Sequence, residues 1–157
     1  MKGLLFLCVA NSARSQMAEG IARALLPQDV GVWSAGSKPT AVRAEAVAVL
    51  REIGIDISEQ RAKGIEAVPL DRIDTVVTPC SGNACPVLPG TTRSLHWEIA
   101  DRATVEGTDA ARAKVFRSAR DELRSHNAEL VAAGRFGERP SDPHAAPTCL
   151  SPLTRLD

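Results

Sequence analysis

A cysteine and an arginine separated by five small residues near the N-terminus are the clearest candidates for chemistry. Cys8 and Arg14 enclose Val9-Ala10-Asn11-Ser12-Ala13, and Ser15 follows directly. Residues of this size let the backbone curl around a tetrahedral anion with its N–H groups directed inward, and the Arg14 guanidinium adds a planar fork for two oxygens. The positive end of a following helix would favour thiolate over thiol. We therefore expect Cys8 to be a nucleophile below a bound oxyanion, with Ser15 donating a hydrogen bond to its sulfur.

The alternative is that Cys8 is a small buried core residue and Arg14 an exposed helix residue, since this spacing also arises by chance. The position in the fold favours chemistry. Leu4-Leu5-Phe6-Leu7 is typical of a strand buried on both faces, and the spacing of apolar residues from Met17 to Leu25 predicts a helix that begins near Ser15 and ends before Pro27. The carboxyl end of a parallel strand is where such sheets bind ligands.

Further apolar patterns predict alternating strands and helices along the rest of the chain. We expect strands at 30–33, 75–78 and 93–96, a helix over 42–54, and a long last helix capped by Thr108 and ending before Gly134. This alternation indicates one α/β domain over residues 1–134, built on a parallel sheet with helices on both faces. Residues 135–157 contain four prolines and no periodicity, which predicts an irregular tail.

Composition narrows the class of protein. The 157 residues include nineteen basic and nineteen acidic side chains, so the total charge gives no indication of nucleic acid or an anionic membrane as partner. The apolar run at the N-terminus is too short for a signal segment or a membrane span. Four cysteines are too few for a secreted disulfide scaffold and point instead to thiol chemistry. We expect a cytoplasmic protein, and a monomer.

Several segments resemble one known family. Residues 5–20 resemble the active-site loop of the low-molecular-weight protein tyrosine phosphatase superfamily, and Arg14-Ser15-Gln16-Met17-Ala18-Glu19 is similar to its thioredoxin-coupled arsenate reductase branch. The resemblance covers residues 3 to about 133 and implies a four-stranded parallel sheet in the order 2-1-3-4. It continues in these short segments: Ser34-Ala35-Gly36, Val76-Val77-Thr78-Pro79-Cys80, Cys85-Pro86-Val87-Leu88-Pro89 and His96-Trp97.

For that branch, the resemblance implies reduction of arsenate to arsenite by a relay of three thiols. Cys8 would attack arsenate held by the loop, and Asp101 would act as the general acid. Cys80 would then form a disulfide with Cys8, and Cys85 would take over to leave a Cys80–Cys85 disulfide for thioredoxin to reduce. The spacing from Cys80 to Cys85 is two residues shorter than the family pattern.

Other interpretations of these residues stay open. Cys80 and Cys85 could be core thiols or half of a zinc site, although their spacing and the single histidine nearby disfavour metal. Asp101 is followed by arginine where the family has proline, and Glu98 and Asp109 are alternative acids. We expect no metal at the thiols.

The resemblance also implies that Asn11 and Ser34 support the loop through hydrogen bonds. It does not decide whether a potassium ion binds beside them. A phosphatase acting on small phosphate esters, or a non-catalytic oxyanion-binding module, would use the same loop. The absence of tyrosine argues against recognition of a phosphotyrosine ring.

Overall fold

The computed structural model describes residues 3–80, 93–99 and 107–133. Four parallel strands form one sheet in the order β2-β1-β3-β4, as expected from the resemblance. Their bounds are β1 Gly3–Cys8, β2 Gly31–Gly36, β3 Thr75–Cys80 and β4 Arg93–Glu98. Each begins where predicted to within one residue, and β2, β3 and β4 run two or three residues further. The α/β fold class is confirmed.

The described residues include three α-helices at the predicted positions. They are α1 Arg14–Leu25, α2 Ala44–Arg51 and α3 Asp109–Ala132. However, α2 begins two residues later and ends three residues earlier than the predicted helix over 42–54. The side chain of Thr108 caps α3 by accepting a hydrogen bond from Ala111 N at 3.1 Å, as expected from the sequence. Two 3₁₀ helices, η1 Ile65–Ala67 and η2 Leu70–Arg72, were not predicted, because segments this short have no apolar periodicity.

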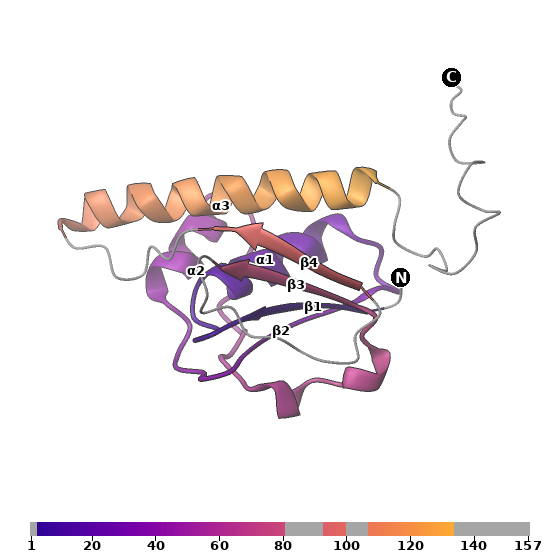
Figure 1. Ribbon diagram of the computed structural model, residues 1–157. Coiled ribbons are helices and arrows are strands. Elements are labelled where there is room, and N and C mark those ends of the chain that lie inside the picture. The colour runs from indigo at the N-terminus through magenta and orange to yellow at the C-terminus, as the bar shows by residue number, and fades with distance from the viewer. Residues whose placement is uncertain (1–2, 81–92, 100–106, 134–157) are drawn as a thin grey trace, which may run out of the picture.

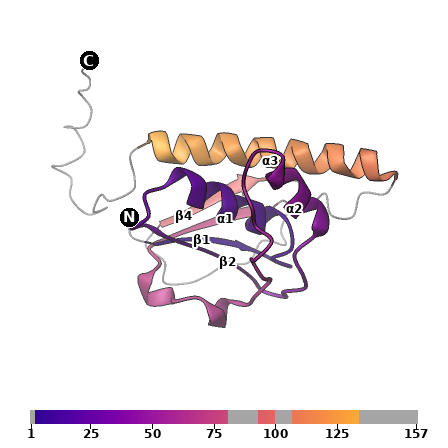
Figure 2. The same cartoon turned by 180° about the vertical axis from the view of Figure 1, so that it is seen from behind.

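Helical elements lie on both faces of the sheet (Figures 1 and 2). The larger apolar cluster joins one sheet face to all three α-helices, through residues such as Phe6, Ile21 and Phe116. The smaller cluster lies on the other face, where Leu5 and Leu7 of β1 pack with Val68 and Ile73 of the segment that carries η1 and η2. Strand alternation explains the division, since successive side chains of β1 point to opposite faces.

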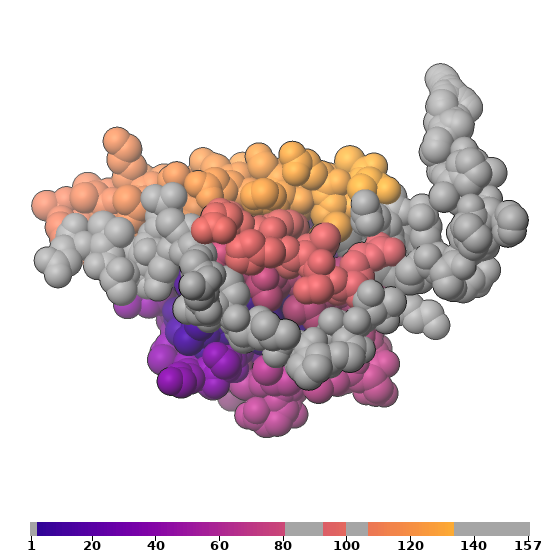
Figure 3. Space-filling view, in the orientation of Figure 1, coloured from indigo at the N-terminus to yellow at the C-terminus, as the bar shows by residue number. Residues whose placement is uncertain are grey.

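Trp97 attaches the edge strand β4 to the rest of the core. Its ring lies 5.7 Å from that of Phe6 and stacks on His126 of α3 at 4.9 Å with an interplanar angle of 16°. The space-filling view shows α3 lying lengthwise beside the β4 residues (Figure 3). This packing fixes the strand that leads toward the predicted acid.

The carboxyl ends of β1 and β3 meet at one edge of the sheet, because the two strands are parallel neighbours. Cys8 ends β1 and Cys80 ends β3, so both predicted redox residues lie at this edge. Cys85, Asp101 and the tail 135–157 lie outside the described residues. Within the described part of the chain, no helix has the length and apolar character needed to cross a membrane.

Candidate active site

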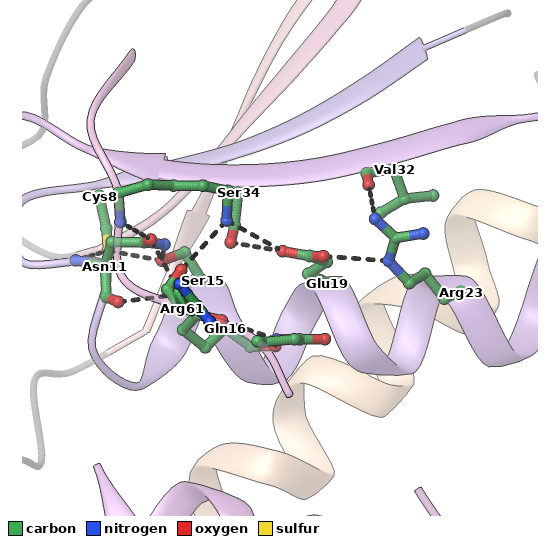
Figure 4. A network of polar contacts seen from close by, with 11 residues as sticks. Cys8, Asn11, Ser15, Gln16, Glu19, Arg23, Val32, Ser34 and Arg61 are labelled. Carbon is green, nitrogen blue, oxygen red and sulfur yellow. Dashed lines mark hydrogen bonds and ion pairs between the residues drawn. The ribbon is translucent and has the colours of Figure 1, made fainter. Parts of the chain in front are cut away.

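Cys8 is a free thiol held at the point where β1 gives way to the loop. Only 2% of the residue is exposed, and its Sγ lies 2.8 Å from Ser15 Oγ and 3.3 Å from the backbone N of Asn11 (Figure 4). Asn11 Nδ2 donates to the same serine hydroxyl at 2.8 Å, which leaves the hydroxyl proton for the sulfur. Two donors thus point at the Cys8 sulfur, an arrangement that stabilises negative charge there.

The backbone carbonyl groups of the loop point outward and accept hydrogen bonds from residues outside it. Cys8 O, Val9 O, Ala10 O and Ser12 O accept hydrogen bonds at 2.8–3.1 Å from the backbone N–H groups of Ser37, Lys38, Thr40 and Arg43, and Asn11 O accepts from Gln16 Nε2 at 3.1 Å. In a planar trans peptide the carbonyl and the following N–H point in opposite directions. The N–H groups of residues 9–13 are therefore directed toward the inside of the loop, which is the side on which Asn11 N–H donates to the Cys8 sulfur. A ring of inward amides of this kind binds tetrahedral oxyanions.

Asn11 sets the curvature of the loop. Its φ is 51°, in the left-handed region that asparagine tolerates better than most residues. The side chain is fully buried, and its Oδ1 accepts from Gln16 Nε2 at 2.8 Å and from the backbone N of Lys63 at 2.9 Å. These bonds anchor the loop to α1 and to a segment fifty residues away.

That distant segment, residues 60–63, supports the loop through hydrogen bonds to Gln16 and Asn11. The sequence did not predict this contact. Gln16 Nε2 also donates to Arg61 O at 3.0 Å, and Gln60 Nε2 donates to Gln16 Oε1 at 2.6 Å. Gln16 is fully buried, so these bonds satisfy an amide that would otherwise be costly to bury. The polar side chain of Gln16 beside Met17 and Ala18 is the only local feature of the sequence that could have indicated such a contact.

Ser34, on β2, is connected to the Cys8 loop less directly than Asn11 is, through hydrogen bonds to α1. Its Oγ donates to Glu19 Oε1 of α1 at 2.6 Å, and Glu19 Oε2 accepts from Arg23 Nε at 3.0 Å. Arg23 also donates to Val32 O (Figure 4). The serine therefore connects β2 to α1 through a buried carboxylate, and Glu19 is a further site residue that the sequence did not single out.

Arg14 begins α1 at the mouth of the loop. Its Nη1 donates to Ile99 O at 3.1 Å, and Ile99 N in turn donates to Cys80 O at 3.4 Å. Ile99 directly follows β4 and is fully buried. The arginine thus contacts the chain two residues before Asp101, whose catalytic role stays a prediction.

Cys80 is disulfide-bonded, in contrast to Cys8, and its partner lies outside the described residues. It is buried, with 2% of its surface exposed. By strand alternation it shares a face with Val76 of the smaller cluster, whereas Cys8 continues the face of Phe6 in the larger one. The two cysteines share an edge but leave the sheet on opposite faces.

Among the described residues, no group of three histidine, cysteine, aspartate or glutamate side chains is placed to hold a metal ion. The chemistry that these residues support is attack by a buried thiolate on an anion held by backbone amides and a guanidinium.

Comparison with known proteins agrees with this geometry. The family model described as low molecular weight phosphotyrosine protein phosphatase matches residues 3–135. An arsenate reductase of Halalkalibacterium halodurans is 44% identical over 124 residues, which cover 78% of this chain and 89% of that protein. A solved arsenate reductase in the oxidized state is 32% identical with a TM-score of 0.71, covering 84% of this chain and 98% of the other.

A thioredoxin-dependent arsenate reductase of Corynebacterium glutamicum is 26% identical with a TM-score of 0.65, covering 88% of this chain and 64% of that one. The family match spans both the loop and the sheet that positions it. The chain therefore belongs to the low molecular weight phosphotyrosine protein phosphatase family.

Proposed function

We propose that this chain is an arsenate reductase in which Cys8 is the nucleophile. The observation that carries the proposal is the pair of buried cysteines at the ends of adjacent strands, with Cys8 free inside the amide ring and Cys80 disulfide-bonded. A hydrolytic phosphatase needs the first cysteine alone. The arsenate reductases of similar sequence and structure support the same choice.

In the proposed reaction, the Cys8 thiolate attacks the arsenic atom of arsenate held by the loop amides and Arg14. A sulfur–arsenic bond forms, and one arsenate oxygen leaves as water after Asp101 donates a proton. What supports this role for Asp101 is that it follows Ile99, the residue whose carbonyl accepts from Arg14, by only two positions in the sequence.

Two thiols then supply the electrons. The Cys80 thiolate attacks the Cys8 sulfur, a disulfide forms, and the sulfur–arsenic bond breaks with its electron pair on arsenic, releasing arsenite. Cys85 next attacks Cys80, which frees Cys8 as thiolate and leaves the Cys80–Cys85 disulfide. The disulfide-bonded state of Cys80 beside a free Cys8 is the state expected at the end of this relay.

Thioredoxin is the proposed reductant of that final disulfide. The thioredoxin-dependent relative from Corynebacterium glutamicum supports this partner. Because the two cysteines leave the sheet on opposite faces, the first exchange requires the chain at Cys80 to change conformation.

The test is arsenate-dependent oxidation of NADPH in the presence of thioredoxin and its reductase. Cys8→Ser, Cys80→Ser and Cys85→Ser should each abolish turnover, and Cys149→Ser is the matched control that should retain it. Unchanged turnover of Cys80→Ser would rule out the relay. Hydrolysis of an aryl phosphate that survives Cys80→Ser and Cys85→Ser, without arsenite formation, would instead establish the phosphatase, and anion binding without any turnover would establish the binding module.

A further inference from the structure

Lys63 is attached to the loop region through both its backbone and its side chain. The backbone N–H donates to Asn11 Oδ1 at 2.9 Å, and the carbonyl accepts from Gly36 N at 2.9 Å. The ammonium lies 3.8 Å from Glu19 Oε1, and 26% of the side chain is exposed. Lys63 therefore joins the residue that curves the loop to the buried carboxylate of α1.

Glu19 needs cationic partners because it is buried. Its side chain is 5% exposed, and an isolated carboxylate in such a place is strongly disfavoured. Arg23 Nε at 3.0 Å and the Lys63 ammonium place two cations beside it, and Ser34 adds a hydrogen bond at 2.6 Å. The carboxylate is thus compensated by groups of the chain itself.

The charged groups around Lys63 agree with its pairing to Glu19. Burial lowers the pKa of the Lys63 ammonium, the charge of Glu19 opposes that shift, and the charge of Arg23 adds to it. Glu19 therefore stabilises the charged form of Lys63 that burial disfavours.

The residues around Glu19 do not fit a potassium ion, whose binding the family resemblance left undecided. Asn11 Oδ1 already accepts two N–H groups, and Glu19 Oε1, which accepts from Ser34 Oγ, also faces the Lys63 ammonium. A third cation at this carboxylate would be repelled by both Arg23 and Lys63.

We propose that Lys63 is a positioning residue whose ammonium is the built-in counter-cation of Glu19, so that the Cys8 loop is organised without potassium. The ammonium holds Glu19 and the residue 60–63 segment together, and the Lys63 N–H then holds Asn11 in its left-handed conformation. Loss of the charge should loosen Asn11, and with it the donors that face the Cys8 sulfur.

The experiment compares wild type with Lys63→Gln, Lys63→Arg and the control Lys114→Gln, an exposed lysine of α3, in potassium chloride and choline chloride of equal ionic strength. The readouts are the melting temperature and the rate of Cys8 alkylation by iodoacetamide. Neither readout uses arsenate, so the result is independent of the proposed reductase activity.

Wild type and Lys114→Gln should behave alike in both salts. Lys63→Gln should melt about 3 °C lower and alkylate severalfold more slowly, with potassium or the charge-retaining Lys63→Arg restoring part of the loss. Stabilisation of wild type by potassium over choline would overturn the proposal. So would a Lys63→Gln protein that matches wild type, or a loss that neither potassium nor Lys63→Arg reverses.

Discussion

Two polar networks of this molecule, one around the Cys8 loop and one between α2 and α3, differ in burial. Below the loop, Asn11, Ser15 and Gln16 are fully buried, and the Glu19 side chain is 5% exposed. Between the helices, 40% of the Glu52 side chain and 46% of the Arg117 side chain are exposed, and Arg120, the second partner of Glu52, is 10% exposed.

The difference in burial separates two uses of the same kinds of side chain. In the interior each unsatisfied donor or acceptor is costly, so the bonds below the loop fix a single geometry around the thiol. Ion pairs in contact with water contribute little individually and mainly orient helices that apolar contacts already hold. Substitutions in the first network should therefore change Cys8 chemistry, and substitutions in the second should change stability alone.

The largest effect should come from Asn11→Ala. The variant loses three side-chain hydrogen bonds and a residue type that tolerates the left-handed region, at a cost of about 3 kcal/mol in the free energy of unfolding. Cys8 alkylation should slow as well. Asn127→Ala is the control, since this asparagine is as deeply buried but its side chain bonds within α3, to Leu123 O. Equal alkylation rates for the two variants would contradict the account.

Gly36→Ala should have the next largest effect, because this glycine touches the loop. A Cβ at this position would lie 2.5 Å from Val9 O and 2.9 Å from Asn11 N, so the loop backbone must move. We expect a loss of about 2 kcal/mol in denaturant unfolding together with slower alkylation of Cys8. A variant that loses stability but keeps the wild-type alkylation rate would show that the loop is not held against β2.

Ser15→Ala should act on the thiol and also lower stability by about 1 kcal/mol, because the buried Asn11 Nδ2 loses its acceptor. A hydrogen bond to a charged group contributes about 1.5–3 kcal/mol, so alkylation of Cys8 at neutral pH should slow about tenfold. The comparison is with Ser125→Ala on the exposed face of α3, which should alkylate at the wild-type rate. No change in Ser15→Ala would mean that the contact does not stabilise the thiolate.

The smallest effect should come from Glu52→Gln, and it should depend on pH. Hydrogen bonds from Arg117 and Arg120 lower the pKa of Glu52 from 4.5 to about 2, so the pairs contribute fully above pH 4.5 and less as pH falls toward 2. The variant should be slightly less stable than wild type at pH 7, and the gap should narrow in acid. The exposed Glu129→Gln serves as control. A gap that widens in acid, or slower Cys8 alkylation, would contradict the separation of the two networks.

Local pattern was sufficient to predict most of the fold. The buried strands read as short apolar runs, and α1 follows from the spacing of Met17 and Ile21. The cap at Thr108 came from residue type alone. The ends of β2, β3 and β4 were missed, because pairing with neighbouring strands rather than local preference extends those elements. The 3₁₀ helices were missed because segments this short have no apolar periodicity.

The site was predictable where its residues are adjacent in sequence, as in the loop from Cys8 to Ser15. Glu19, Gln60 and Lys63 were missed, because their contacts arise only when segments about fifty residues apart are packed together. Ser34 was expected beside the loop, and its actual partner is Glu19, which no spacing in the sequence indicates.

The most direct test of the central claim is a single turnover of fully reduced protein with arsenate and no external reductant. The chain has four cysteines, and we predict one arsenite released and two thiols lost per chain, with the disulfide located between Cys80 and Cys85 by peptide mass spectrometry. Cys8 should remain alkylatable after the reaction. Absence of arsenite, or retention of all thiols after exposure to arsenate, would contradict the proposed function.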